Sequence, residues 1–306
     1  MIISASYKTD IPALYGDWFR ARRAAGHATV RNVWNGKDFR VSLRDEDCSA
    51  FVFWTRNPAP FRDELDRTAQ RHPFTVQFTV NGNPRWLERA VPARADAVEE
   101  LNRISARFGP DAAVWRYDPV LLTDDTPASW HVDNFTRIAD AVAGATNEVV
   151  VSFARIYRKT RRNLDRACAM HRHQWQGPPD SQRTDLAAAL QDRAGERGIT
   201  LSLCAQPDLI AAGKGEGITF TPARCIDVAR LNRVAAHFGI ADVTARTKGP
   251  REGCLCAESR DIGAYDTCSH GCVYCYAVSD PDAARRHQRA HRPDAESLHP
   301  ETVSAP

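Results

Sequence analysis

The sequence lacks any apolar run long enough to cross a bilayer, which takes about 18 residues. We therefore expect no transmembrane helix and no membrane partner. Residues 1–8 also lack the basic leader and apolar core of a signal peptide, so we expect a cytoplasmic protein.

Strong charge and the common catalytic motifs are scarce as well. The net charge is +3, too small to indicate nucleic-acid binding by itself. There is no Walker-type or Gly-rich phosphate loop, and no local pattern of nucleophile, histidine and acid. With 306 residues, 43% of them hydrophobic, the composition is that of a globular protein with a sizeable core.

Cysteine is the residue type that stands out. There are nine cysteines, an odd number, and five of them lie close together near the C-terminus. This clustering indicates metal binding in a reducing compartment rather than a disulfide framework. Cys268, Cys272 and Cys275 have the spacing Cys-x3-Cys-x2-Cys. Three thiolates on one short loop can hold three irons of a 4Fe-4S cluster and leave the fourth iron open.

Zinc is the alternative for these three cysteines. A zinc site normally pairs Cys-x2-Cys units or adds a histidine at fixed spacing, whereas His270 lies between two of the cysteines. The spacing therefore favours an Fe–S cluster.

Four further cysteines could act together, because a closed Fe–S cluster or a structural zinc site needs four thiolates. The alternative is that they are ordinary small thiols of the core. Our hypothesis is a second, fully ligated metal centre formed by Cys204, Cys225, Cys254 and Cys256.

Short β-rich runs alternate with amphipathic helical patterns, which predicts an α/β protein with a parallel sheet. Polar side chains follow each predicted strand, as in a partial or complete β/α (TIM-like) barrel with one site at the C-terminal face. An open sheet would concentrate them at one switch point. The predicted strands span 2–6, 50–54, 74–80, 112–117, 148–153 and 199–204, with one more at 243–245; the helical patterns span 11–25, 59–71, 94–108, 131–143, 157–197 (two helices) and 226–237.

The domain organisation follows from this pattern. Residues 1–250 are expected to form the barrel, and residues 251–280 a Cys-rich loop packed on the barrel mouth. Residues 281–306 have few large apolar side chains, which predicts a flexible tail or extended arm.

The polar residues at the strand ends are the candidate site. Arg116 and Asp118 end an apolar strand, so we expect them to pair with each other or with a ligand, and likewise Lys8 with Asp10. The alternatives are structural ion pairs and helix caps, with Thr9 or Asp10 as a cap. We predict catalytic roles for Lys8, Asp10, Arg116 and Asp118, and cofactor contacts for Ser4, Asn57 and Gln77.

Several longer segments carry a family resemblance: residues 2–12, 51–58, 115–119, 152–160 and the Cys-rich end with 261–265. Together they look like the uncharacterised bacterial family called domain of unknown function 1848, from residue 1 to about residue 278. The Cys-x3-Cys-x2-Cys loop followed by an aromatic residue also resembles the radical S-adenosylmethionine enzymes. Residues 272–277 are similar to the cluster loop of spore photoproduct lyase.

The resemblance implies a radical S-adenosylmethionine-type enzyme of unknown substrate, with a 4Fe-4S cluster and S-adenosylmethionine as cofactors. It implies that Tyr274 packs against adenine, although simple loop packing is the alternative, and that a ferredoxin or flavodoxin donates electrons. The loop departs from those enzymes by lying at the far end of the chain, and no Gly-Gly-Glu-like segment follows the second predicted strand.

Two other function classes stay open. One is a non-catalytic or electron-transfer Fe–S (or zinc) protein. The other is a nucleic-acid-binding relative of lesion-repair enzymes, which would use the basic run at residues 155–162 and the Arg-rich tail.

Overall fold

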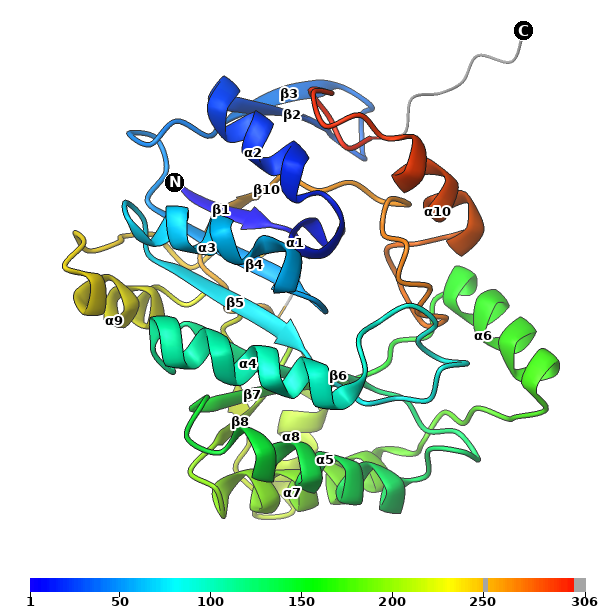
Figure 1. Cartoon of the computed structure of the whole chain (residues 1–306). Helices are drawn as coiled ribbons and strands as arrows, with labels where there is room; N and C mark the ends of the chain where they lie inside the picture. Colours follow the sequence, from blue (N-terminus) through cyan, green and yellow to red (C-terminus); the bar gives the residue numbers. More distant parts are fainter. Residues whose placement is uncertain (250–252, 300–306) are drawn as a thin grey trace, which may run out of the picture.

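A computed structural model describes residues 1–249 and 253–299 of the chain (Figure 1). A parallel sheet of eight strands lies at its centre, in the order β10-β1-β4-β5-β6-β7-β8-β9. No helix within the two described ranges has both the length and the apolar character to cross a membrane. The strands of this sheet are β1 (Ile2–Ala5), β4 (Ala50–Thr55), β5 (Phe74–Thr79), β6 (Ala113–Val120), β7 (Glu148–Phe153), β8 (Thr200–Leu203), β9 (Thr221–Pro222) and β10 (Ser259–Asp261).

The order of the strands follows the chain from β1 to β9, and the last strand, β10, pairs with the first. Every neighbouring pair is parallel, which confirms the predicted α/β fold with a parallel sheet. Among the described residues no ladder joins β9 to β10, so the hydrogen-bonded sheet is open between these two short strands.

The helices are α1 (Ile11–Leu14), α2 (Gly16–Ala25), η1 (Ala59–Phe61), α3 (Arg62–Ala69), α4 (Arg94–Phe108), α5 (Ala128–Val142), α6 (Arg158–His171), α7 (Asp180–Gly195), α8 (Pro207–Gly215), α9 (Val228–Phe238) and α10 (Pro281–Ala290).

The sheet has two buried faces with different coverings. On the first face, helices pack over aromatic side chains; Phe19 of α2, for example, contacts the rings of Phe51 and Phe53. Figure 1 shows α3 and α4 running alongside β4 and β5 on this side. Burying each such ring contributes roughly 1.5–3 kcal/mol.

The second face is covered by chain segments that follow β8 and β9. Its strand residues, such as Val52 and Val150, pack with Cys225, Leu231 and Cys256 in one buried cluster. We call this the thiol-bearing face. Because the sheet buries both faces, its strands read as nearly continuous apolar runs.

The predicted strand at 243–245 is wrong, because those residues form no strand. Val243 is buried, and its backbone N–H and C=O are instead bonded by the side chain of Asn232, at 2.7 and 3.2 Å. These bonds satisfy the backbone without a strand partner. The prediction also missed a separate antiparallel hairpin, β2 (His27–Arg31) with β3 (Asp38–Ser42).

The expected flexible tail is wrong for its described part, residues 281–299. Asp280 accepts hydrogen bonds from two backbone N–H groups of the first turn of α10, which caps this helix. Beyond α10 the chain packs on α2, where Trp18 Nε1 donates to the carbonyl of Ala295 at 2.9 Å and Leu298 is buried. Residues 300–306 lie outside the described residues.

His131 on α5 provides a test of the core. It is buried, its Nδ1 lies 2.8 Å from the hydroxyl of Tyr117, and its Nε2 faces the carbonyl of Leu121 at 3.0 Å. Burial lowers the pKa of His131 from 6.5 to about 4. Between these values the unfolded chain binds a proton that the folded chain does not, so stability is lost as the pH falls.

We expect His131 to remove on the order of 3 kcal/mol from the free energy of unfolding between pH 6.5 and pH 4. Urea unfolding of the wild type and of His131→Gln across this range measures the effect as a difference in pH dependence. His237→Gln, at an exposed histidine, is the control. Identical pH dependence in His131→Gln and the wild type would contradict the prediction.

Candidate metal and ligand site at the strand ends

The three cysteines of the Cys-x3-Cys-x2-Cys motif lie on one closed loop, residues 266–277. The loop is tied at its neck by a hydrogen bond from Asp266 N to Ala277 O at 2.9 Å. A turn bonds Cys275 N to Cys272 O at 3.1 Å, and Ala277 N donates to Cys275 Sγ at 3.4 Å. Local hydrogen bonds therefore fix the backbone that carries these thiols.

The three thiols are close enough to interact. Burial raises the pKa of each, that of Cys272 to about 12. Asp10 and the other two thiols raise the pKa of Cys268 further. Across the described residues, no set of three or more His, Cys, Asp or Glu side chains is arranged to hold a metal ion. As a donor set, three neighbouring thiols on one loop match the chemistry of an Fe–S cluster, whose binding would release their protons.

Asp10 and His270 join this loop to the ends of the strands. His270 Nε2 lies 2.6 Å from Asp10 Oδ2, and its Nδ1 lies 3.1 Å from the carbonyl of Ala90. A carbonyl only accepts, so Nδ1 carries a proton. Asp10 also accepts from Ala13 N at 3.0 Å as the cap of α1, as predicted, and from Arg56 N at 2.7 Å. One carboxylate thus orders three segments.

Lys8 does not pair with Asp10, so the expected pairing is wrong. Lys8 Nζ instead lies 3.5 Å from Asp261 on β10. Asp261 also accepts from the hydroxyls of Ser4 at 2.9 Å and Ser6 at 2.7 Å, which fastens β10 to the end of β1. A side chain at Gly263 would meet Ser6 Oγ at 2.0 Å, so this close approach requires glycine. Sequence reasoning missed Asp261 as a site residue.

Tyr274 is buried next to a charged pair. Its hydroxyl accepts from Arg56 Nη2 at 2.6 Å and donates to Glu88. Arg56 and Glu88 also form an ion pair at 2.8 Å. Burial acts to raise the pKa of Glu88, but Arg56 and the surrounding donors hold it below its usual range. The hydroxyl of Tyr274 is thus held by protein partners, so a ligand would contact its ring.

Arg116 and Asp118 form the ion pair expected from the sequence, at the end of β6. Arg116 is buried and uses Nη1 to reach both Gln77 Oε1 at 3.2 Å and Cys225 Sγ at 3.1 Å. Its guanidinium also lies 4.9 Å from the ring centroid of Trp54. Arg116 therefore joins the strand ends to the thiol-bearing face.

Cys204, Cys225, Cys256 and Cys254 form a row of contacts, which we call the thiol row. Cys225 Sγ lies 3.6 Å from Cys204 Sγ, and the thiols of Cys256 and Cys225 are hydrogen-bonded. The hydrogen bond with Cys256 lowers the pKa of Cys254 to about 7, whereas the pKa of Cys256 is raised to about 11. The structure thus brings the four predicted ligands together; their binding of a metal stays a prediction.

Tyr276 of the cysteine loop contacts Tyr7, which follows β1. The hydroxyl of Tyr276 donates to the carbonyl of Tyr7 at 2.6 Å. Desolvation of its hydroxyl and then Cys275 raise the pKa of Tyr276, although the residue is 42% exposed. Burial and then Asp261 raise the pKa of Tyr7, and Cys254 makes a smaller contribution. The two tyrosines therefore interact with one cysteine set each, and the sequence had not singled out either of them.

Asn57 forms no hydrogen bond with the cysteine loop or the thiol row among the described residues. Its Oδ1 accepts from Ala59 N at 3.2 Å, which forms an Asx turn just before η1. It lines a cavity of about 500 Å³ together with Phe78, Pro92 and Glu100. Its predicted contact with a cofactor stays a prediction.

The buried pair of Arg56 and Glu88 generates a stability prediction. Glu88→Gln keeps the shape but leaves the buried guanidinium of Arg56 without its counter-charge. We expect the free energy of unfolding to fall by about 3 kcal/mol. Glu99→Gln, which removes an exposed partner of Arg103, is the matched control and should cost less than about 1 kcal/mol. Equal losses in the two variants, measured by urea denaturation, would disprove the proposed role of this pair.

Comparison with known proteins supports the resemblance to the domain of unknown function 1848 family. The model of the family described as Domain of unknown function (DUF1848) matches residues 2–277. A search of curated proteins found no match. The matched region contains every strand of the sheet, the cysteine loop and the thiol row. The chain therefore belongs to the family Domain of unknown function (DUF1848).

Proposed function

We propose that this protein is an Fe–S enzyme of the radical S-adenosylmethionine type, whose 4Fe-4S cluster is held by Cys268, Cys272 and Cys275. The observation that carries the proposal is the closed loop that places these three thiols together and fastens them to the strand ends through His270 and Asp10. Such a cluster, when reduced, supplies one electron for cleavage of a C–S bond of S-adenosylmethionine.

We propose further that the sheet is a TIM-like barrel. Eight parallel strands follow one another in chain order, and the last pairs with the first, which is the strand order of that fold. The cysteine loop, Asp10 and Asp118 then belong to the C-terminal face, where barrels of this kind carry their active sites.

The chain's own residues have separable tasks in this proposal. The side chains of Asp118 and Lys8 are partly exposed, 21% and 13%, so they can contact a ligand. Arg116 is buried and is a positioning residue: it holds Asp118 through their ion pair, while the hydroxyl of Ser152 donates to the other oxygen of Asp118. Asp261 holds Lys8 in the same way.

A first experiment tests the cluster and the reaction on one sample. Anaerobically reconstituted protein should contain iron and sulfide, absorb at about 400 nm, and form 5′-deoxyadenosine from S-adenosylmethionine after reduction. Cys272→Ala should abolish both the cluster signal of this loop and deoxyadenosine formation. Cys168→Ala, at a cysteine that neither set uses, is the control.

The outcomes distinguish a radical S-adenosylmethionine enzyme from an electron-transfer Fe–S protein and from a zinc protein. Zinc without iron would overturn the Fe–S proposal. Iron and sulfide without deoxyadenosine would leave an electron-transfer Fe–S protein and refute the radical reaction.

The thiol row suggests a second metal centre, since four contiguous thiols are the donor set of a closed Fe–S cluster or a structural zinc site. We expect more than four irons per chain, or four irons with one zinc. Cys225→Ser should remove only the additional metal, and Cys48→Ser should remove none. Four irons or fewer with no zinc, measured by elemental analysis, would exclude this centre.

A further inference from the structure

Two helices beside the cysteine loop concentrate the positive charge of the chain. Helices α6 and α10 together carry eight Arg and Lys residues and two Asp residues, a net charge of +6. The whole chain has a net charge of +3, so the rest of it is net −3. The small overall charge therefore hides a strongly basic region.

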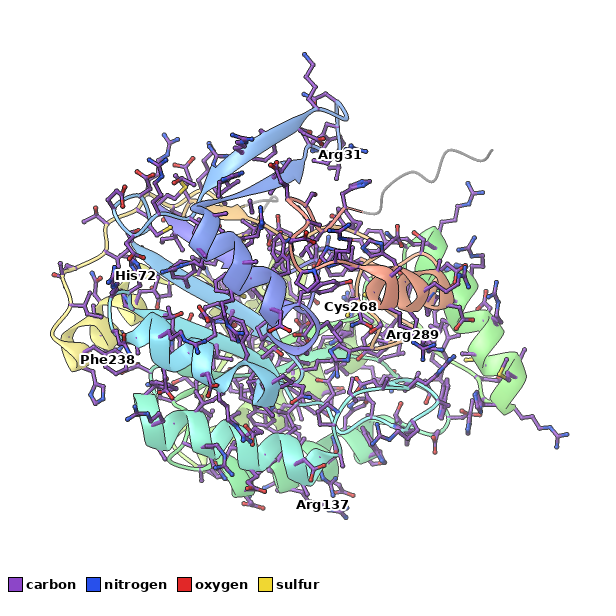
Figure 2. All side chains as sticks on the ribbon, turned by 45° about the horizontal axis from the view of Figure 1, so that its top comes forward. Arg31, His72, Arg137, Phe238, Cys268 and Arg289 are labelled. Atoms are coloured by element: carbon purple, nitrogen blue, oxygen red, sulfur yellow. The ribbon has the colours of Figure 1, made fainter. Side chains whose placement is uncertain are left out.

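The two helices meet where the cysteine loop ends. From α6, Arg162 and Asn163 both donate to the carbonyl of Ser279, at 2.9 and 3.3 Å. Backbone N–H groups of α10 lower the pKa of Asp280, and Arg286 of α10 and Arg166 of α6 lower it further. Figure 1 shows α6 and α10 on the same side of the molecule, and Figure 2 shows Arg289 of α10 on the side of Cys268, with Arg137 elsewhere.

Most of these cations form no ion pair with a carboxylate among the described residues. Elsewhere on the surface arginines are commonly paired, as Arg107 is with Asp66 and Arg197 with Asp140. Exposed positive charges that lie close together without ion pairs repel one another, and such a region is typical of a surface that binds a polyanion. Six exposed arginines of α6 and α10 form no ion pair among the described residues: Arg158, Arg161, Arg162, Arg166, Arg286 and Arg289.

Aromatic rings lie between this basic region and the strand ends. Tyr157, directly before α6, is 48% exposed, and Tyr276 of the cysteine loop is 42% exposed. The ring of Tyr265 has Lys159 on one side and Lys8 near it as well, with centroid distances of 5.3 and 5.6 Å. Exposed rings beside a cluster of cations are the features with which proteins stack bases and hold a phosphate backbone.

We propose that α6 and α10 bind the backbone of a single-stranded nucleic acid and that Tyr157 and Tyr276 stack its bases beside the cysteine loop. A membrane surface fits less well, because α10 has alanine as its only apolar residue type and could not insert. An acidic protein would engage the arginines but would leave the tyrosine rings without a role. The proposed binding of nucleic acid does not depend on the proposed function. The further statement that the nucleic acid is the substrate does rest on it.

The test measures binding of a fluorescein-labelled 20-nucleotide oligothymidylate by the full chain at several salt concentrations. Arg286→Gln/Arg289→Gln should weaken binding about tenfold at 0.1 M salt and lower the slope of log affinity against log salt by about 1.4, or 0.7 per lost phosphate contact. The control Arg137→Gln/Lys214→Gln removes the same charge from α5 and α8 and should change neither value.

A second pair of variants separates base stacking from simple charge attraction. Tyr157→Ala should weaken oligothymidylate binding about fivefold or more, Tyr157→Phe should not, and neither should alter binding of heparin, which has no bases. Equal loss for heparin and oligothymidylate, or no binding of oligothymidylate, would overturn the proposal. So would arginine-dependent binding of a purified acidic flavodoxin with none of oligothymidylate. Deoxyadenosine formation in the same preparations shows separately whether the proposed function holds.

Discussion

The carboxylate of Asp10 is the contact on which the candidate site depends. It accepts hydrogen bonds from the first turn of α1 and from the backbone after β4, and it lies 2.6 Å from Nε2 of His270 in the cysteine loop. Asp10 and His270 are both buried, where leaving a polar group unpaired costs about 1–3 kcal/mol. If the cysteine loop moved away from the strand ends, the carboxylate of Asp10 would become exposed or would lose a buried hydrogen-bond partner. A contact 260 residues apart in sequence joins the C-terminal cysteines to the N-terminal strand.

Arg116 imposes a second constraint, on the thiol-bearing face. A buried guanidinium needs compensation, and here it comes from Asp118, from the amide of Gln77 and from the sulfur of Cys225. The hydrogen bond with Cys204 and, more weakly, the cation act to lower the pKa of Cys225, but its bond with Cys256 and its burial raise that pKa overall to about 11. The residues that complete the fold on this face are thus also the residues of the thiol row.

The parts of the structure that could be predicted are those with local signals. The apolar periodicity located β7 and α4 at their observed residues, and the Gly177–Pro179 region marked the break between α6 and α7. β9 has two residues and β10 three, too few to show any periodicity. The prediction that Cys204 lies near Cys225 rested only on the number of remaining thiols, because a closed metal site needs four. Lys8 pairs with Asp261 rather than with Asp10 because β10 pairs with β1. No local sequence pattern predicts that strand pairing.

The C-terminal segment shows how composition can mislead. Its scarcity of large apolar residues predicted a flexible arm, yet residues 281–299 are held by a capped helix, by the buried Leu298 and by polar bonds to α2. This attachment has an electrostatic cost, because it places the cations of α10 beside those of α6. The protein would be under less repulsion with this segment free in solvent. That it is docked, with arginines facing outward beside the cysteine loop, is the physical reason to expect an anionic partner at this face.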